Sequence, residues 1–189
     1  MDIMLFTSSP NVNGLTASCG EKARLGIEKA GAGVQMIDLN KKNIRHCQAC
    51  EQGWGICRTE NRCIIENDDF NNIHESMADM DGYIIITPVY WWDMSESAKV
   101  FFDRFRRCEA LNKNSCIAGK PFTCIAAAGG TGNGCVSCLS VMEKLVDHVK
   151  GDKFDFIHIV QKNREFKLET IGHSARAMVN YIEKRKSQT

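Results

Sequence analysis

The chain has 189 residues and a formal net charge of +1, so its charge favours neither nucleic acid nor an anionic membrane as a partner. Its hydrophobic content is 43% and its charged content 25%, which is ordinary for a soluble globular protein, and we expect a single domain over residues 1–189. No apolar run is long enough to span a bilayer. Because the first residues also lack the basic and apolar regions of a signal peptide, a cytoplasmic protein is expected.

Five short apolar runs alternate with helical segments along the chain. The runs cover residues 3–7, 34–38, 83–87, 122–127 and 156–160, and the helical segments cover residues 15–30, 69–80, 95–107, 136–149 and 171–185. Nearly continuous apolar strands between helices are typical of a parallel sheet that is covered on both faces. With short, right-handed connections, the sequence predicts an α/β fold with a doubly wound five-stranded parallel sheet.

The first candidate site is the polar turn between the first strand and the first helix. A helix N-terminus presents unpaired N–H groups and a partial positive charge, which together suit a phosphate group. The turn lacks the Gly-Lys-Ser/Thr of a P-loop, so neutral donors would hold the phosphate. The alternative is an ordinary capped turn. The candidate residues are Ser8, Ser9, Asn11, Asn13, Gly14, Leu15 and Thr16.

Two further loops follow the third and fourth strands and should reach the same edge of the sheet, where open α/β sheets bind ligands. The first contains three aromatic rings that can stack on a flat ligand, cap the sheet or form a subunit interface. The second is rich in glycine, which permits close approach of the backbone to a ligand or simply makes the loop flexible. The candidate residues are Pro88, Val89, Tyr90, Trp91, Trp92 and Asp93 in the first loop, and Ala128, Gly129, Gly130, Thr131 and Gly132 in the second.

Three segments of the chain resemble a known family. Residues 8–16, Ser-Ser-Pro-Asn-Val-Asn-Gly-Leu-Thr, resemble the Ser-Pro-Arg-x-x-Gly-Asn-Thr phosphate turn of the flavodoxin-like, NAD(P)H-dependent FMN reductases, and residues 79–90 and 97–104 resemble the family's next strand and helix. The resemblance implies a flavodoxin-like fold with strand order 2-1-3-4-5. It also implies FMN, with its phosphate on the first loop and its ring between the other two, and NAD(P)H as substrate. Asn11 and Leu15 depart from the family pattern, which usually has Arg and Asn there.

A cysteine-rich insertion, at about residues 44–68, follows the second strand. Four thiols within it are enough to hold an iron–sulfur cluster or a tetrahedral zinc ion, and the alternative is a set of free or reversibly oxidised thiols. The stretch is also similar to the cysteine motif of the iron–sulfur flavoproteins, which implies a [4Fe–4S] cluster. The spacing differs from that motif, because residue 53 is Gly and the third thiol is delayed. The candidate ligands are Cys47, Cys50, Cys57 and Cys63.

Most of the other cysteines are expected to be buried core residues and not to take part in chemistry. Cys19, Cys108 and Cys124 fit apolar helix faces or strand positions, where cysteine behaves as a small hydrophobic residue. Cys135 and Cys138 form a second Cys-x-x-Cys at the start of a helix. Because that position tends to lower the pKa of a thiol, a redox pair is an alternative interpretation there.

The family resemblance implies flavin redox chemistry. We expect an FMN-dependent oxidoreductase that passes hydride or electrons from NAD(P)H to a small-molecule or protein acceptor. No catalytic side chain is expected, because the cofactor supplies the chemistry. The alternative is an iron–sulfur flavoprotein that carries electrons between a ferredoxin-like donor and an acceptor, and a flavin- or thiol-based redox sensor is a third hypothesis. By analogy with relatives, we expect a homodimer or homotetramer.

Overall fold

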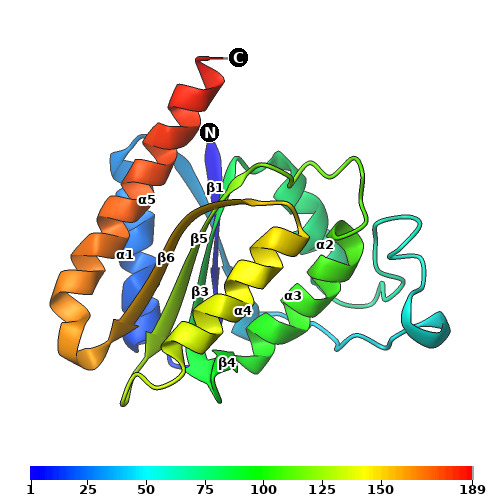
Figure 1. Cartoon of the computed structure of the whole chain (residues 1–189), viewed down its shortest axis with the longest axis horizontal. Helices are drawn as coiled ribbons and strands as arrows, with labels where there is room; N and C mark the ends of the chain where they lie inside the picture. The colour runs from blue at the N-terminus through cyan, green and yellow to red at the C-terminus, as the bar shows by residue number, and fades with distance from the viewer. Residues whose placement is uncertain (189) are drawn as a thin grey trace.

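The computed structural model describes residues 1–188 and shows a central parallel sheet between two layers of helices (Figure 1). Five long strands run in the order β2-β1-β3-β5-β6, and a short sixth strand, β4, pairs with β3 in the antiparallel direction. The five parallel strands confirm the predicted flavodoxin-like fold, and β4 is an addition to it. The strands are β1 (Asp2–Thr7), β2 (Gly33–Asp38), β3 (Gly82–Tyr90), β4 (Asp93–Met94), β5 (Pro121–Ala128) and β6 (Asp152–Val160).

The helices form one layer on each face of the sheet. Figure 1 shows α1 and α5 on one side and α2, α3 and α4 on the other. The α-helices are α1 (Leu15–Lys29), α2 (Phe70–Ser76), α3 (Glu96–Glu109), α4 (Cys135–His148) and α5 (Arg164–Lys186). Short 3-10 helices cover Leu39–Lys41, Glu51–Gly53, Met77–Asp79 and Gln161–Asn163.

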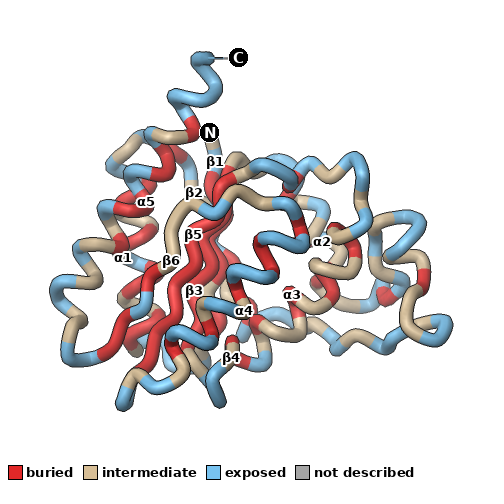
Figure 2. Tube along the Cα trace, viewed as in Figure 1, coloured by how far each residue is buried: buried red, intermediate tan, exposed pale blue. Residues whose placement is uncertain are grey.

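The alternation of side chains along each strand divides the core between the two faces of the sheet. In β1, Ile3 and Leu5 pack with α1 and α5, whereas Met4 and Phe6 pack with α2, α3 and α4. The strands at the centre of the sheet are therefore buried on both sides (Figure 2), and every residue of β5 is buried. Within residues 1–188, none of the helices combines the length and the apolar character that crossing a bilayer requires.

Several element boundaries differ from the sequence prediction: β6 begins at Asp152 instead of 156, α2 ends at Ser76 instead of 80, and the third strand and the last helix are both longer than predicted. The prediction ended the third strand at Thr87, but β3 continues to Tyr90 because its last residues pair with β4. The last helix was predicted from Ile171 and begins at Arg164, directly after a 3-10 turn that follows β6. The carboxyl ends of β1, β3 and β5 thus lie at one edge of the sheet, and each is followed by one of the three candidate loops.

Candidate functional site

The loop after β1 is bound to the segment after β3 by hydrogen bonds to the backbone of Ser8. The Ser8 carbonyl accepts a hydrogen bond from Ser95 Oγ at 2.9 Å and another from Ser97 Oγ at 3.2 Å. The Ser8 hydroxyl is buried and donates to the carbonyl of Ile86 at 3.4 Å. The Ser8 side chain therefore links this loop to β3, and its role as a cofactor ligand stays a prediction.

The rest of this loop is an anion-compatible turn. Asn11 N–H donates to Ser9 Oγ at 3.2 Å, and Asn13 N–H donates to Asn11 Oδ1 at 3.1 Å, so side chains fix the turn locally. Helix α1 begins after Gly14 with no side-chain cap and no acidic residue in its first turn within the described chain. The first N–H groups of the helix are therefore available to a ligand. Leu15 is buried and can contribute only its backbone N–H.

A groove of about 150 Å³ runs beside this turn, between the ends of β1 and β2. Its lining includes Ser9, Asn11 and Thr16 from the predicted set. It also includes Lys41, which sequence reading missed because this residue lies beyond the second strand, 25 positions from Thr16. Lys41 Nζ lies 3.2 Å from Asp38 Oδ2, so much of its charge is already compensated at this edge.

The loop after β3 is a two-residue hairpin with exposed aromatic rings. Trp91 and Trp92 join β3 to β4 and have φ angles of 49° and 65°, the combination that a type I′ turn requires. For a residue with a Cβ, such as tryptophan, this left-handed backbone conformation costs about 1–2 kcal/mol of conformational free energy. Trp91 is 88% exposed. Its ring packs edge to face against the ring of Trp92, with 5.3 Å between the ring centroids. A strained backbone that displays large rings is a feature of binding sites.

The glycine-rich loop after β5 contacts this hairpin. Gly134, with φ of 85°, comes so close to Trp92 that a Cβ on it would lie 2.8 Å from Trp92 Cα. Gly129 and Gly130 have open space where a Cβ would be, so the loop presents bare backbone to solvent. The structure thus brings all three predicted loops together at the carboxyl edge of the sheet, and their role in holding a cofactor stays a prediction.

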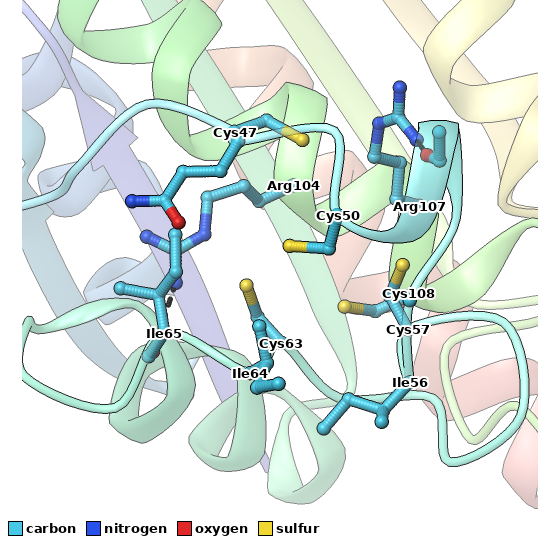
Figure 3. A pocket seen from close by; sticks show the side chains of 13 residues that line it. Cys47, Cys50, Ile56, Cys57, Cys63, Ile64, Ile65, Arg104, Arg107 and Cys108 are labelled. Carbon is cyan, nitrogen blue, oxygen red and sulfur yellow. Dashed lines mark hydrogen bonds between the residues drawn. The ribbon is translucent and has the colours of Figure 1, made fainter.

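A second candidate site is a cavity in the cysteine-rich insertion, beside α3 (Figure 3). All four predicted thiols line this small cavity. Cys108, a buried thiol of α3, is a fifth. Sequence reading correctly predicted burial of Cys108 but missed this location, because the residue lies 45 positions after Cys63. Gln48 of the insertion and Arg104 and Arg107 of α3 complete the polar lining.

The insertion is attached to α3 by a buried ion pair. Asp68 accepts a hydrogen bond from Arg104, and the side chains of the two residues are 0% and 1% exposed. Asp68 also accepts hydrogen bonds from the N–H groups of Arg45 at 2.9 Å and Phe70 at 3.1 Å. Burial alone would raise the pKa of Asp68, but these donors outweigh burial and lower the pKa below its usual value. The guanidinium of Arg104 lies 4.1 Å from the centre of the Phe70 ring.

The thiols of the insertion are the candidate ligands of a metal centre. Among the described residues, no group of three or more His, Cys, Asp or Glu side chains is placed to hold a single metal ion. Four thiolates on one zinc ion, with Zn–S bonds of about 2.3 Å, would lie within about 4 Å of one another. The four thiols line one cavity, and the kind of centre that they would hold stays a prediction.

The second Cys-x-x-Cys does not have the features of a redox pair. Cys135 and Cys138 are both buried at the start of α4, and both are free thiols. Burial raises the pKa of Cys135 and raises the pKa of Cys138 to about 12. The lowering that the helix start predicts is therefore outweighed by desolvation, and these thiols resemble core residues. Cys19 and Cys124 are buried as predicted.

The architecture of the sheet and its three edge loops agrees with a comparison to protein families. The model of one family, described as NADPH-dependent FMN reductase, matches residues 1–157. The chain belongs to this family. The match includes the three loops, the cysteine-rich insertion and every strand except the last three residues of β6.

Comparisons with individual proteins give relatives and solved structures with low sequence identity to this chain. An iron–sulfur flavoprotein of Methanocaldococcus jannaschii is 30% identical over 106 residues, which are 56% of this chain and 52% of the relative. The chain thus spans about half the length of that protein. The structure of RosB with a bound 8-demethyl-8-formylriboflavin-5′-phosphate intermediate has a TM-score of 0.80 at 11% identity and covers 100% of this chain and 81% of RosB. An NAD(P)H:quinone oxidoreductase of Methanothermobacter marburgensis has a TM-score of 0.71 at 19% identity, with 94% and 96% of the two chains covered.

Proposed function

We propose that this chain is an FMN-dependent oxidoreductase that passes hydride or electrons from NAD(P)H to a small-molecule or protein acceptor. The observation that carries the proposal is the position of three loops at the same carboxyl edge of a flavodoxin-like sheet. Open α/β sheets bind ligands at this edge. Membership of the FMN reductase family supports FMN as the ligand, and the flavin derivative bound to RosB, a protein of similar fold, is consistent with it.

The residues of the three loops fit the parts of FMN. The uncapped N-terminus of α1, with Ser9, Asn13 and Thr16, would bind the phosphate through dipoles and hydrogen bonds. The rings of Tyr90, Trp91 and Trp92 and the bare backbone of residues 129–132 would hold the flavin ring and exclude water from one side of it. FMN, when bound, supplies the hydride and electron transfer. The chain therefore needs no side-chain nucleophile at this site.

A change of charge in the first loop tests FMN binding. Replacing Asn13 by aspartate places a carboxylate beside the proposed phosphate, and two like charges about 4 Å apart repel by about 1–4 kcal/mol between water and a protein surface. We expect FMN affinity, measured by quenching of flavin fluorescence, to fall at least tenfold. Asn114→Asp is the matched control, because Asn114 is also exposed but precedes β5, at the opposite edge of the sheet. Equal FMN affinity in the two variants would contradict the proposed phosphate site.

A second function, electron transfer between a ferredoxin-like donor and an acceptor, is favoured by the thiol cavity. Cys47, Cys50, Cys57 and Cys63 would hold a [4Fe–4S] cluster, and their donor set fits one, because four half-buried thiols of one insertion face a common space. The names of several relatives as iron–sulfur flavoproteins support this reading. By analogy, we also propose a homodimer or homotetramer, in which the cysteine-rich insertion of one subunit approaches the flavin site of another.

Anaerobic purification separates the two functions. We expect iron and sulfide to copurify with the protein, and Cys63→Ser to remove most of the iron. Cys116→Ser is the control, because Cys116 is exposed and does not line the cavity. An absorption spectrum before and after dithionite reports flavin and cluster together. Turnover with NADPH or NADH would favour the reductase, whereas rapid reduction by ferredoxin without such turnover would favour the carrier. Negligible iron under anaerobic conditions would contradict the cluster.

A further inference from the structure

One buried donor of the thiol cavity has no partner. Arg104 is 1% exposed, and its terminal nitrogens donate to Asp68, to the carbonyl of Arg45 at 3.0 Å and to the carbonyl of Ile65 at 3.3 Å. Its Nε is the one buried side-chain nitrogen or oxygen of residues 1–188 that has no hydrogen-bond partner. A buried donor without a partner lowers the stability of the folded protein by about 1–3 kcal/mol. An acceptor beside Arg104 Nε would remove this cost.

The position of Arg104 limits what that acceptor is. The residue lines the cavity together with the four candidate ligands, and in Figure 3 its side chain crosses the view between Cys47 and Cys63. None of these thiols accepts the Nε–H in the structure, and neither does the amide oxygen of Gln48, which also lines the cavity. Much of the remaining lining is aliphatic, with Ile56, Ile64 and Ile65. The acceptor is therefore a group that the thiols themselves would hold in the cavity.

The charges around the cavity suit a negatively charged group. The charge of Arg104 is compensated by Asp68, so Arg104 would act as an oriented N–H donor more than as a free cation. Arg107 supplies the positive charge, because no ion pair with a carboxylate is found for it in the described chain. Its guanidinium lies 4.9 Å from the centre of the Trp54 ring and donates to the carbonyl of Gly53. Iron–sulfur clusters with four thiolates are anionic, and hydrogen bonds to their sulfurs adjust the reduction potential.

We infer that Arg104 donates its Nε–H to a sulfur of the [4Fe–4S] cluster and thereby stabilises the reduced state. This inference rests on the cluster in the second proposed function, and it assigns a role to a residue that is not itself a ligand. One electron added to the cluster increases the negative charge on its sulfurs. The hydrogen bond consequently becomes stronger on reduction, and its presence raises the midpoint potential.

Pulsed EPR on the dithionite-reduced holoprotein tests this directly. Protein made with arginine labelled with ¹⁵N only in the guanidino group should show a ¹⁵N coupling to the reduced cluster. Arg107→Lys should keep the coupling, which excludes the other arginine of the cavity, and Arg104→Lys should lose it. Arg104→Lys retains a positive charge for Asp68 but has no Nε–H. We therefore expect a lower midpoint potential in that variant, by about 59 mV if the reduction equilibrium shifts tenfold.

The possible failures are distinct from one another. A protein that contains the cluster but shows no ¹⁵N coupling in the wild type would overturn this inference and leave the cluster in place. The same holds if the coupling disappears in Arg107→Lys. A protein without iron and sulfide would overturn the cluster, and this inference with it. If Arg104→Lys does not fold, the labelled wild type and Arg107→Lys still decide the question.

Discussion

Replacing Asp68 by asparagine should lower the free energy of unfolding by about 3–5 kcal/mol, because it leaves the charge of Arg104 buried without a counter-ion. Asp68 also accepts hydrogen bonds from two backbone N–H groups, and asparagine can accept with only one oxygen. The loss should appear in urea unfolding followed by circular dichroism at pH 7. The loss should shrink in acid: the pKa of Asp68 is lowered in the folded state, so its stabilisation is present above about pH 3.8, the ordinary value, and disappears below it.

A matched control for this prediction lies two residues away. Glu66→Gln removes a charge from the same insertion, but Glu66 is 68% exposed and pairs with Arg62 at the surface at 3.1 Å. Surface pairs of this kind contribute about 0–1 kcal/mol. A further variant, Asp68→Asn with Arg104→Met, should recover part of the loss, because it removes the buried charge that Asp68→Asn alone leaves without a counter-ion. If Asp68→Asn and Glu66→Gln have the same small effect, the ion pair does not anchor the insertion.

Exchanging Trp91 and Trp92 for asparagine and glycine should have two opposite effects. Asn-Gly is the preferred pair for a type I′ hairpin, whereas both tryptophans occupy left-handed conformations. The variant without FMN should therefore be more stable, by about 1 kcal/mol after the lost contact between the two rings is subtracted. FMN affinity should fall about tenfold to hundredfold, because stacking on an aromatic ring contributes about 1–3 kcal/mol. Thermal unfolding and flavin titration measure the two effects separately.

Phenylalanine at both positions is the control for the hairpin. Trp91→Phe with Trp92→Phe keeps two aromatic rings and the strained backbone, so both stability and FMN affinity should remain close to those of the wild type. If the Asn-Gly variant gains stability and retains full FMN affinity, the rings do not bind the flavin. If it loses stability, the tryptophans have a structural role that outweighs the backbone strain.

The fold was predictable because its determinants are local in the sequence. The apolar runs at Ile3 and Tyr83 and the helices between them follow from hydrophobic periodicity, and short connections then leave few topologies. The hairpin was not predictable, because Trp91-Trp92 lacks the asparagine or glycine that usually marks a type I′ turn. Sequence reading therefore assigned residues 88–93 to a loop, whereas the structure pairs most of them in β3 and β4.

In the candidate sites, too, residues that are close in sequence were predictable, whereas residues that only the fold brings together were not. The four clustered cysteines were visible as a group because they are close in sequence. Cys108 and Arg104 were not, since 36 residues separate Arg104 from Asp68, and helix α3 reads as an ordinary amphipathic helix. A buried arginine in such a helix gives no sign of its partner until the fold is known. Ser8 also makes hydrogen bonds to β3 and to the start of α3 that the sequence did not predict, and its role as a cofactor ligand stays a prediction.

The ion pair between Asp68 and Arg104 has a consequence for how the protein recovers from oxidative damage. The insertion is attached to α3 by protein groups alone, through Asp68, Arg104, Phe70 and the backbone of Ile65. These contacts hold the end of the insertion, residues 65–70, without the help of any bound group. If the proposed cluster forms on the cysteines, its loss to oxygen should leave this attachment intact, and repair would then require thiol reduction and delivery of iron and sulfide without refolding of the rest of the chain.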